Sequence, residues 1–459
     1  KKPDYGNYLR GYGENTKKYN ISNSYNKNKS RPYIDEDTSQ LIITQKYNIL
    51  RVYFFNNKEK QKSLIYHLTK DADKKFFKGS IEESLKTYSF LINEIKIEDP
   101  NIFFNAGINA YRLKYLKKSK NYFNKCNFLV RKAKNNYSPK LKSSCLYWEA
   151  RLESSDKKKF QLYSKASKLE RSLYGQLAIE KLKKVENFNW NYSKHTNVSH
   201  EDIDISKYKS FKRLISLSEL NAYDKADLEM RNLYSKIGKS NSKLLFFLSE
   251  KLDLAAVQIR LGEAFYQKDY RLYMRGMYPT PEWSLENSLI FDKALIYALI
   301  RRESAFNFRA KSAKGARGLM QLMPRTASKI KKDYRLRYGH KDHLYSLNLN
   351  LELGQKLLIE LQSYSNTKKS ILSTLIAYNA GITRLNKWNK SIREDDPLAF
   401  IESIPIKETR MFVKYILTDL WIYRDKLGQS KPTRTTLAND RWPRFSNQDF
   451  KYVRDAKLR

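Results

Sequence analysis

The sequence predicts a mainly helical, all-α protein, with an N-terminal α-solenoid of helical hairpins followed by a compact, mostly helical domain. Only 15 glycines and 11 prolines occur in 459 residues, too few for a loop-rich all-β protein. Apolar residues recur at spacings of three and four along much of the chain, which is typical of amphipathic helices. With 41% hydrophobic residues the chain can bury a sizeable core, which excludes a wholly disordered protein.

The N-terminal half of the sequence predicts an irregular arm followed by an array of helical hairpins. Residues 1–40 are rich in Asn, Tyr, Lys and Ser and predict an irregular arm. In residues 41–283, short amphipathic helices pair roughly every 35 residues, the size of a helical-hairpin repeat. One hairpin cannot bury its apolar face alone, so stacking into an α-solenoid is expected. Within this array, the polar residues 187–206 predict a long loop.

The sequence pattern changes after Pro279 and Pro281. These two prolines stop a helix and favour an extended connection. Beyond them, glycine-containing turns separate apolar helices. This pattern predicts a separate compact domain over residues 284–430. The polar and basic residues 431–459 predict a tail that is extended or mobile.

The charge balance is strongly basic. Lys and Arg number 89 against 48 Asp and Glu, a formal net charge of +41. Such a balance indicates either a polyanionic partner or lysines spread over solvated helix faces. The lysines are scattered rather than concentrated, which favours the second interpretation. No nucleic-acid-binding motif accompanies the charge, so no nucleic-acid partner is expected.

Cysteine and histidine usage predicts no metal and no cofactor. Two cysteines, Cys126 and Cys145, exclude a disulfide-rich scaffold; they are compatible with one disulfide or with two buried thiols, and we favour the thiols. The five histidines lack the spacing of a zinc hydrolase. No apolar run is long enough for a transmembrane helix. The chain starts at Lys1 without a secretory leader, so we expect any export signal to have been removed or to be absent.

One glutamate stands out at the end of a predicted helix. Asp292 is a suitable N-cap for this helix. Its apolar stripe consists of Phe291, Ala294, Leu295, Ala298 and Leu299. Glu303 continues the stripe by one step. Desolvation there raises a carboxyl pKa and favours the neutral acid that a general acid requires.

Four motifs follow one another in this region. They are Glu-Ser-Ala-Phe-Asn at 303–307, Gly-Leu-Met-Gln-Leu-Met-Pro at 318–324, Ala-Tyr-Asn-Ala-Gly at 377–381, and Glu-Ser-Ile-Pro at 402–405 with Glu-Thr-Arg at 408–410. Together they resemble the soluble lytic murein transglycosylase family, over about residues 291–430. The resemblance implies a lysozyme-like catalytic domain preceded by an α-superhelical domain.

The resemblance also implies an activity and a compartment. The family cuts the β-1,4 bond between N-acetylmuramic acid and N-acetylglucosamine in peptidoglycan and leaves a 1,6-anhydromuramic acid end. Peptidoglycan glycan strands would be the partner, in the periplasm, and no cofactor would be needed. Two alternatives stay open: a lysozyme-type hydrolase on the same fold, and an inactive peptidoglycan-binding solenoid scaffold. A hydrolase needs a second carboxylate, for which the domain offers Asp333, Asp342, Asp395 and Asp396.

The resemblance also implies roles for individual residues of these motifs. Glu303 would be the catalytic acid and then base, and Tyr378 would orient it. Substrate binding would involve Gln321, Met323, Tyr378, Asn379 and Glu402. The residues alone leave other interpretations open for three of these: Met323 as core, Asn379 as a helix-terminal cap, and Glu402 as an ion-pair partner of an arginine.

Three positions depart from the family pattern. Arg317 stands where many relatives carry a small residue, which predicts an altered rim of the cleft. Phe308 stands where proline is common, and Phe412 where tyrosine is common. None of the three is Glu303, so we expect the activity to be kept.

Overall fold

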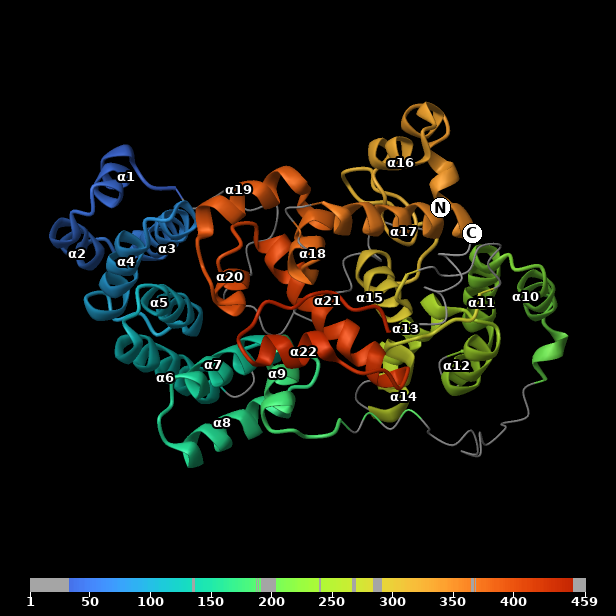
Figure 1. The fold of residues 1–459 in the computed structure, drawn as a ribbon, viewed down its shortest axis with the longest axis horizontal. Helices are drawn as coiled ribbons and strands as arrows, with labels where there is room; N and C mark the ends of the chain where they lie inside the picture. Colours follow the sequence, from blue (N-terminus) through green and yellow to red (C-terminus); the bar gives the residue numbers. More distant parts are fainter. Residues whose placement is uncertain are drawn as a thin grey trace. The chain divides into compact units, whose positions relative to one another are not determined.

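The computed structural model describes residues 33–133, 137–186, 188, 190, 204–238, 241–265, 270–283, 291–364, 367 and 369–448 (Figure 1). Over these residues the regular structure is helical, and extended pairing is limited to isolated bridges such as Lys311 with Arg317. The predicted all-α class is confirmed. Most of the predicted arm and of the predicted loop at 187–206 lies outside the described residues.

The chain divides into two compact units. Unit 1 comprises Lys1–Val185, Asn366–Thr418 and Pro432–Phe445, and unit 2 comprises Glu186–Ser365, Asp419–Lys431 and Ser446–Arg459. These units follow from contacts in space, whereas the four predicted segments at 1–40, 41–283, 284–430 and 431–459 follow the chain. The predicted segment boundaries stay a prediction.

Unit 1 holds the first nine helices and several from near the end of the chain. The former are α1 (Glu36–Ile43), α2 (Tyr47–Asn56), α3 (Gln61–Lys78), α4 (Ile81–Asn93), α5 (Pro100–Arg112), α6 (Leu116–Lys132), α7 (Pro139–Arg151), α8 (Asp156–Ser167) and α9 (Leu173–Lys181). The latter are α18 (Ile371–Ala380), α19 (Ile382–Ile392), α20 (Pro397–Glu402), the first part of α21 (Lys407–Lys426) and α22 (Pro432–Ala438).

Unit 2 holds the middle helices and the last turns of α21. Its helices are α10 (Lys209–Glu219), α11 (Tyr223–Ile237), α12 (Ser242–Lys251), α13 (Ala255–Phe265), α14 (Tyr270–Met277), α15 (Lys293–Glu303), α16 (Pro324–Lys331) and α17 (Leu347–Ser363), with 3-10 turns η6 (Tyr334–Arg337) and η7 (Lys341–Tyr345). Helix α14 ends just before the two prolines that predicted a stop.

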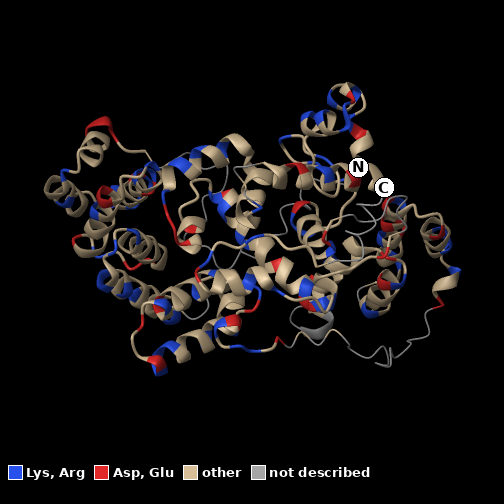
Figure 2. Cartoon of the chain, viewed as in Figure 1, with Lys and Arg blue, Asp and Glu red and all other residues tan. Residues whose placement is uncertain are grey.

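Consecutive helices pack as hairpins, as the repeat pattern predicts. Helix α3 pairs with α4, α5 with α6, and α7 with α8 in unit 1, and α10 pairs with α11 and α13 with α14 in unit 2. The α5–α6 pair shows why small residues recur. A Cβ added at Gly107 would meet the Phe123 ring at 2.6 Å, so the two helices cross too closely for a larger residue. Lys and Arg are distributed over most helices rather than gathered in one block (Figure 2).

The two cysteines form a disulfide, so the preference for two free thiols was wrong. Cys126 lies on α6 and Cys145 on α7, and neither side chain is exposed. The packing of α6 against α7 brings their Cα atoms to 5.8 Å, within the range that a disulfide spans. A sequence separation of 19 residues could not reveal this, because it depends on how the two helices pair.

The predicted tail is not wholly extended. Its residues 432–438 form α22, which begins at Pro432 and packs against α9. Arg434 donates to Glu180 at 2.9 Å and to Gln176 at 2.9 Å. These polar partners on α9 hold a helix that has too few apolar residues to be evident from periodicity.

Candidate active site

Helix α15 carries the predicted catalytic glutamate and is buried on nearly all sides. Asp292 caps its first turn by accepting a hydrogen bond from the Leu295 backbone N–H at 3.0 Å, as predicted. The predicted apolar stripe is too narrow, because every residue from Ala294 to Arg301 is buried. The helix is therefore a core element rather than a surface helix with one apolar face.

Three ion pairs, made by two buried aspartates, fix α15 against α21 within unit 2. At its start, Asp292 pairs with Arg424 at 3.1 Å, and neither side chain is exposed. At its end, Arg301 and Arg302 both contact Asp419, at 3.0 and 2.6 Å. Because each ion pair joins α15 to α21, the position of the helix is fixed at both ends.

The pair at the end of α15 belongs to a larger network. The Tyr278 hydroxyl donates to Asp419 at 3.1 Å, and Arg301 donates to the Met277 carbonyl at 2.6 Å. The Arg301 guanidinium also lies 4.4 Å from the centre of the Tyr278 ring. Sequence reasoning missed this network, although two adjacent arginines beside a candidate acid were a visible signal.

Glu303 is the last residue of α15 and is half-buried. Two residues later the backbone enters the left-handed region, at Ala305 with φ 54° and Phe306 with φ 62°. Two consecutive non-glycine residues in this region are costly and persist only where the surroundings enforce them, often at functional sites. The Phe306 side chain is completely buried and supplies that constraint. Glu303 therefore occupies a sharply turned, rigid end of a buried helix.

The second motif is tied to the turn that follows Glu303. The Ala310 carbonyl accepts hydrogen bonds from the Gly318 backbone N–H and from the Gln321 side chain, both at 3.0 Å. Gln321 is half-buried and has a left-handed backbone, with φ 48°. The Met323 side chain, by contrast, is exposed, so the interpretation of Met323 as core was wrong. Their predicted roles in substrate binding stay predictions.

Asn350 on α17 organises the second motif and was not predicted. Its side chain accepts from the Met320 backbone N–H at 2.8 Å and donates to the Arg317 and Leu344 carbonyls at 3.0 and 2.7 Å. A Cβ added at Gly318 would lie 2.3 Å from this amide. Gly318 is thus needed for close packing against Asn350.

The third motif lies on α18 in unit 1. Tyr378 and Asn379 are both half-buried, and the helix ends at Gly381 with φ 88°. The Asn379 side-chain oxygen accepts a hydrogen bond from the Thr409 hydroxyl at 2.7 Å, which joins this motif to the fourth. Phe412, one of the departures from the family pattern, stacks on Tyr378 with the ring centres 6.3 Å apart.

Glu402 is buried and paired, also within unit 1. It is the last residue of α20, and its carboxylate accepts hydrogen bonds from the Tyr174 hydroxyl and from the Lys414 ammonium. The ion-pair interpretation therefore holds, with a lysine in place of an arginine. Burial lowers the pKa of Lys414, while the charge of Glu402 opposes that change. The role of Glu402 in substrate binding stays a prediction.

The other two positions that depart from the family pattern contact residues within unit 2. Arg317 donates to Asp342 at 3.1 Å and to the Gly315 carbonyl at 2.6 Å, and its side chain is largely buried. Phe308 is buried and stacks on Tyr223 with the ring centres 6.4 Å apart. Both residues thus contribute to packing within unit 2.

Three of the four aspartates considered as a second acid are bound to arginines. Asp342 pairs with Arg317. Asp333 pairs with Arg335 at 3.0 Å. Asp396 caps α20 and pairs with Arg151 at 2.6 Å. Asp395 is exposed.

Metal-binding clusters and membrane-spanning helices are both absent from the residues that the structure describes. No group of three or more His, Cys, Asp or Glu side chains there is arranged to hold a metal ion. Nor does that part of the chain contain a helix with the length and hydrophobicity needed to cross a membrane.

Comparison with solved structures defines the class of fold. The 70 kDa soluble lytic transglycosylase of Escherichia coli superimposes with a TM-score of 0.66 and 20% identity, over 89% of this chain and 64% of that one. An inactive variant of the lytic transglycosylase Slt of Pseudomonas aeruginosa gives a TM-score of 0.59 and 21% identity, over 90% of this chain and 66% of that one. The chain thus has the all-α fold of these proteins.

Sequence comparison then shows which proteins the C-terminal part of the chain is similar to. Residues 286–401 match the model of the transglycosylase SLT domain. The soluble lytic murein transglycosylase of Escherichia coli K12 is 38% identical over 139 residues, which are 30% of this chain and 21% of the relative. That of Salmonella typhimurium is 35% identical over 150 residues, or 32% and 22%. The matches thus span about a fifth of these relatives. The predicted resemblance is confirmed: residues 286–401 match the SLT domain, and the chain is similar to soluble lytic murein transglycosylases over about a third of its length.

Proposed function

We propose that this protein is a peptidoglycan lytic transglycosylase. It would cleave the β-1,4 bond between N-acetylmuramic acid and N-acetylglucosamine and leave a 1,6-anhydromuramic acid end. The observation that carries the proposal is Glu303, which lies within the matched SLT domain at the rigid end of a buried helix. The ion pairs of Asp292 and Asp419 support it, because a catalytic acid needs a fixed position.

Glu303 would act twice in the reaction. Protonated, it gives its proton to the glycosidic oxygen as the bond to C1 breaks, and positive charge develops on the muramic acid ring. The 2-acetamido group of the same sugar stabilises this charge. Glu303, now a carboxylate, takes the proton from the C6 hydroxyl, and that oxygen bonds to C1. The attack is intramolecular, so its effective molarity can be on the order of 10⁵ M or more, and water competes poorly.

A hydrolase on this fold would need a second carboxylate to activate water. The pairing of Asp333, Asp342 and Asp396 with arginines counts against their use as a base. Glu402 is likewise engaged by Tyr174 and Lys414. These contacts favour the transglycosylase over the lysozyme-type alternative.

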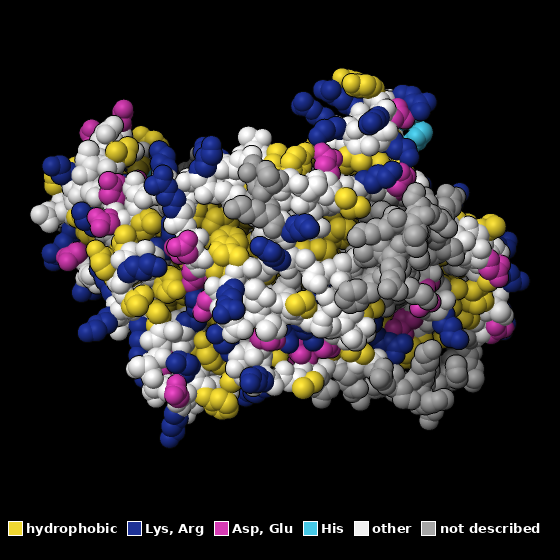
Figure 3. Space-filling model, viewed as in Figure 1, with side chains coloured by type: hydrophobic (Ala, Val, Ile, Leu, Met, Phe, Trp, Pro, Cys, Tyr) yellow, Lys and Arg dark blue, Asp and Glu magenta, His cyan; other side chains and the backbone are white. Residues whose placement is uncertain are grey.

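The solenoid would hold the polymer. Peptidoglycan strands are long, and their peptide stems bear carboxylates, so scattered cations can retain them without one specific patch. Lys and Arg are dispersed over the visible face of the molecule (Figure 3). Peptidoglycan lies outside the cytoplasmic membrane, so the proposed compartment is the periplasm.

The direct test is Glu303→Gln, which keeps the size of the side chain and removes its acid. Removal of a general acid costs about 10²–10⁴-fold in rate, and more when the same group also serves as the base. We expect release of soluble fragments from purified sacculi to be abolished, with an unchanged thermal unfolding midpoint.

Glu360→Gln is the matched control, because Glu360 pairs with Lys329 on the surface of unit 2. It should turn over substrate as the wild type does. Activity of Glu303→Gln within tenfold of wild type would overturn the assignment. A wild-type protein that binds sacculi but releases nothing would instead support the inactive scaffold.

A further inference from the structure

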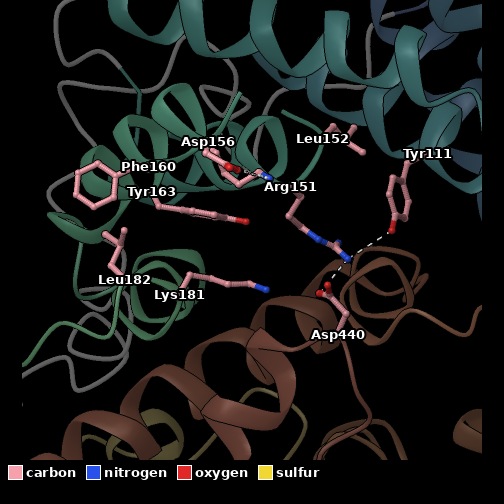
Figure 4. Close-up of a pocket in the computed structure, with 10 residues that line it drawn as sticks. Tyr111, Arg151, Leu152, Asp156, Phe160, Tyr163, Lys181, Leu182 and Asp440 are labelled. Carbon is pink, nitrogen blue, oxygen red and sulfur yellow. Dashed lines mark hydrogen bonds and ion pairs between the residues drawn. The ribbon is translucent and has the colours of Figure 1, made fainter. Parts of the chain in front are cut away.

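Unit 1 contains a pocket that none of the four motifs uses. It has a volume of about 490 Å3, in the range of small-molecule sites. Its walls come from the ends of α5 and α7, from α8, from the end of α9 and from the turn after α22 (Figure 4). The lining residues are Tyr111, Arg151, Leu152, Asp156, Lys159, Phe160, Tyr163, Lys181, Leu182 and Asp440.

The deep wall of this pocket is a polar cluster around Arg151. One guanidinium nitrogen of Arg151 donates to Asp396 at 2.6 Å and to Asp440 at 3.0 Å. The other terminal nitrogen is buried and has no hydrogen-bond partner. The Arg151 side chain is only 8% exposed, so this free donor is costly. The cluster is therefore held in place by its own ion pairs, yet its hydrogen bonding is incomplete.

The outer walls alternate in charge. Lys181 ends α9, and its side chain points into the pocket near Asp440, whose carboxylate is 44% exposed (Figure 4). On α8, Lys159 and Asp156 form a second pair, at 3.4 Å. Three cations thus face two carboxylates around one space. This balance does not favour a simple anion; it fits a ligand that carries both charges.

Apolar side chains fill the space between these charges. Phe160 on α8 is 59% exposed, which is unusual for so large an apolar residue. Leu182 is half-buried beside it, Leu152 is half-buried on the opposite side near Tyr111, and Tyr163 lies with its hydroxyl end toward Arg151 (Figure 4). An aliphatic chain could lie against these side chains while its charged ends reach the lysines and carboxylates.

We propose that this pocket binds an amino-acid-type zwitterion: a free carboxylate and a free ammonium on a short aliphatic chain. Lys181 would bind the carboxylate, with Arg151 behind it, and Asp440 would bind the ammonium. This inference deepens the proposed function, on which it rests, because the diamino-acid end of peptidoglycan stem peptides has this chemistry. The pocket would then be a stem-peptide site on the solenoid.

Binding to the full chain tests the ligand class without any turnover. The probes are meso-diaminopimelate, which has both charges, pimelate, which lacks the amines, and 1,5-diaminopentane, which lacks the carboxylates. We expect calorimetric titration to give binding of diaminopimelate at least tenfold tighter than that of either control probe, since each loses one set of charge-assisted hydrogen bonds. Equal binding of pimelate would mean a plain anion patch and would overturn the proposal.

Point variants locate the site. Lys181→Gln removes the cation, and Asp440→Asn removes the anion while tolerating the left-handed backbone at that position, where φ is 57°. Each should weaken diaminopimelate binding at least tenfold. Lys181→Gln should leave the thermal midpoint unchanged, whereas Asp440→Asn should lower it because Arg151 loses one of its two carboxylates. Lys184→Gln, an exposed lysine outside the pocket, is the control and should bind as wild type. Wild-type affinity in both pocket variants would contradict the assignment.

Cleavage assays connect the pocket to the proposed function. Lys181→Gln should lower kcat/KM about tenfold on glycan strands that carry stem peptides and leave it unchanged on stem-free strands. Equal kcat/KM of the variant and the wild type on both substrates would overturn a stem-peptide role. If the wild type cleaves neither substrate, the proposed function fails, while the binding titration still decides the ligand class.

Discussion

Glu303 and Glu402 are both the last residues of helices, and both begin sequence motifs, yet their environments differ. Glu303 ends α15 and is half-buried, and the two arginines that precede it are directed to Asp419. Glu402 ends α20, is 7% exposed, and is bound by Tyr174 and Lys414. A helix C-terminus disfavours negative charge in both cases. At Glu402 the Lys414 ammonium compensates for this.

The two glutamates thus stand in different relations to a buried polar network. Around Asp419 the network positions the helix that presents a glutamate. Around Glu402 the glutamate is itself the centre of the network. Breaking each network should therefore have different consequences for turnover, which the following variants measure.

The largest change in stability is expected for Asp419→Ala. Its removal leaves Arg301 and Arg302 without their shared carboxylate, and Arg301 is 1% exposed. Loss of one partner of a buried ion pair costs about 3–5 kcal/mol of the unfolding free energy. Urea unfolding measures this loss, and kcat should fall as well because the end of α15 loses its support. Asp342→Asn breaks the pair between Arg317 and Asp342, in which the aspartate is exposed. This change should cost about 0–1 kcal/mol of the unfolding free energy. Similar losses for the two variants would contradict the role of the Asp419 network.

Glu402→Gln should cost somewhat less, roughly 3 kcal/mol, because the amide can still accept from Tyr174 while Lys414 loses its counter-charge. Folded variant protein should retain kcat within tenfold, since Glu402 is occupied by its own partners. Steady-state kinetics on soluble glycan fragments separate the two possible roles. A raised KM at unchanged stability would instead support the predicted contact with substrate.

A smaller effect distinguishes two lysines of α21. Lys414 has Glu402 as its partner, whereas Lys426 donates to the Tyr278 carbonyl and lies 5.6 Å from the Trp190 ring centre. Burial lowers the pKa of Lys426 to about 8. Between pH 8 and the ordinary lysine pKa, Lys426 is mostly neutral in the folded chain and protonated in the unfolded chain. Unfolding therefore takes up a proton in this window. The contribution of Lys426 to stability therefore rises with pH in this window.

Unfolding free energies at pH 8.0 and 9.5 test this sign. Relative to Lys426→Met, the wild type should gain about 1–2 kcal/mol over that interval, from about 1.4 kcal/mol per pH unit. Other groups cancel in the difference between the two proteins. Lys390→Met, at an exposed lysine of α19, should leave the pH dependence unchanged. A wild-type stability that falls relative to Lys426→Met would refute the assignment.

Much of the fold and of the site was readable in the sequence because it is encoded locally. Helix periodicity gave the all-α class, and Asp292 caps its helix as its residue type predicted. The four motifs gave the resemblance to soluble lytic murein transglycosylases, whereas the catalytic role of Glu303 stays a prediction. In each case neighbouring residues along the chain are sufficient to specify the feature.

The features that were missed depend on pairing between distant segments. Asp419 meets Arg301 across 118 positions, Asn350 meets Met320 across 30, and Cys126 meets Cys145 only because α6 packs on α7. Periodicity assigned a single apolar stripe to α15, since it cannot reveal that other elements cover the helix on its remaining sides. The need for glycine at position 318 likewise depends on the Asn350 side chain, which lies 32 positions further along the chain.

The central claim is that one glutamate serves as acid and then base in an intramolecular reaction. Mass spectrometry of fragments released from purified peptidoglycan in heavy-oxygen water tests it most directly. The account predicts 1,6-anhydromuramic acid ends, lighter than hydrolytic ends by one water and free of label, and predicts that Glu303→Gln releases none. Reducing ends that carry the heavy oxygen would contradict it and would identify the protein as a lysozyme-type hydrolase.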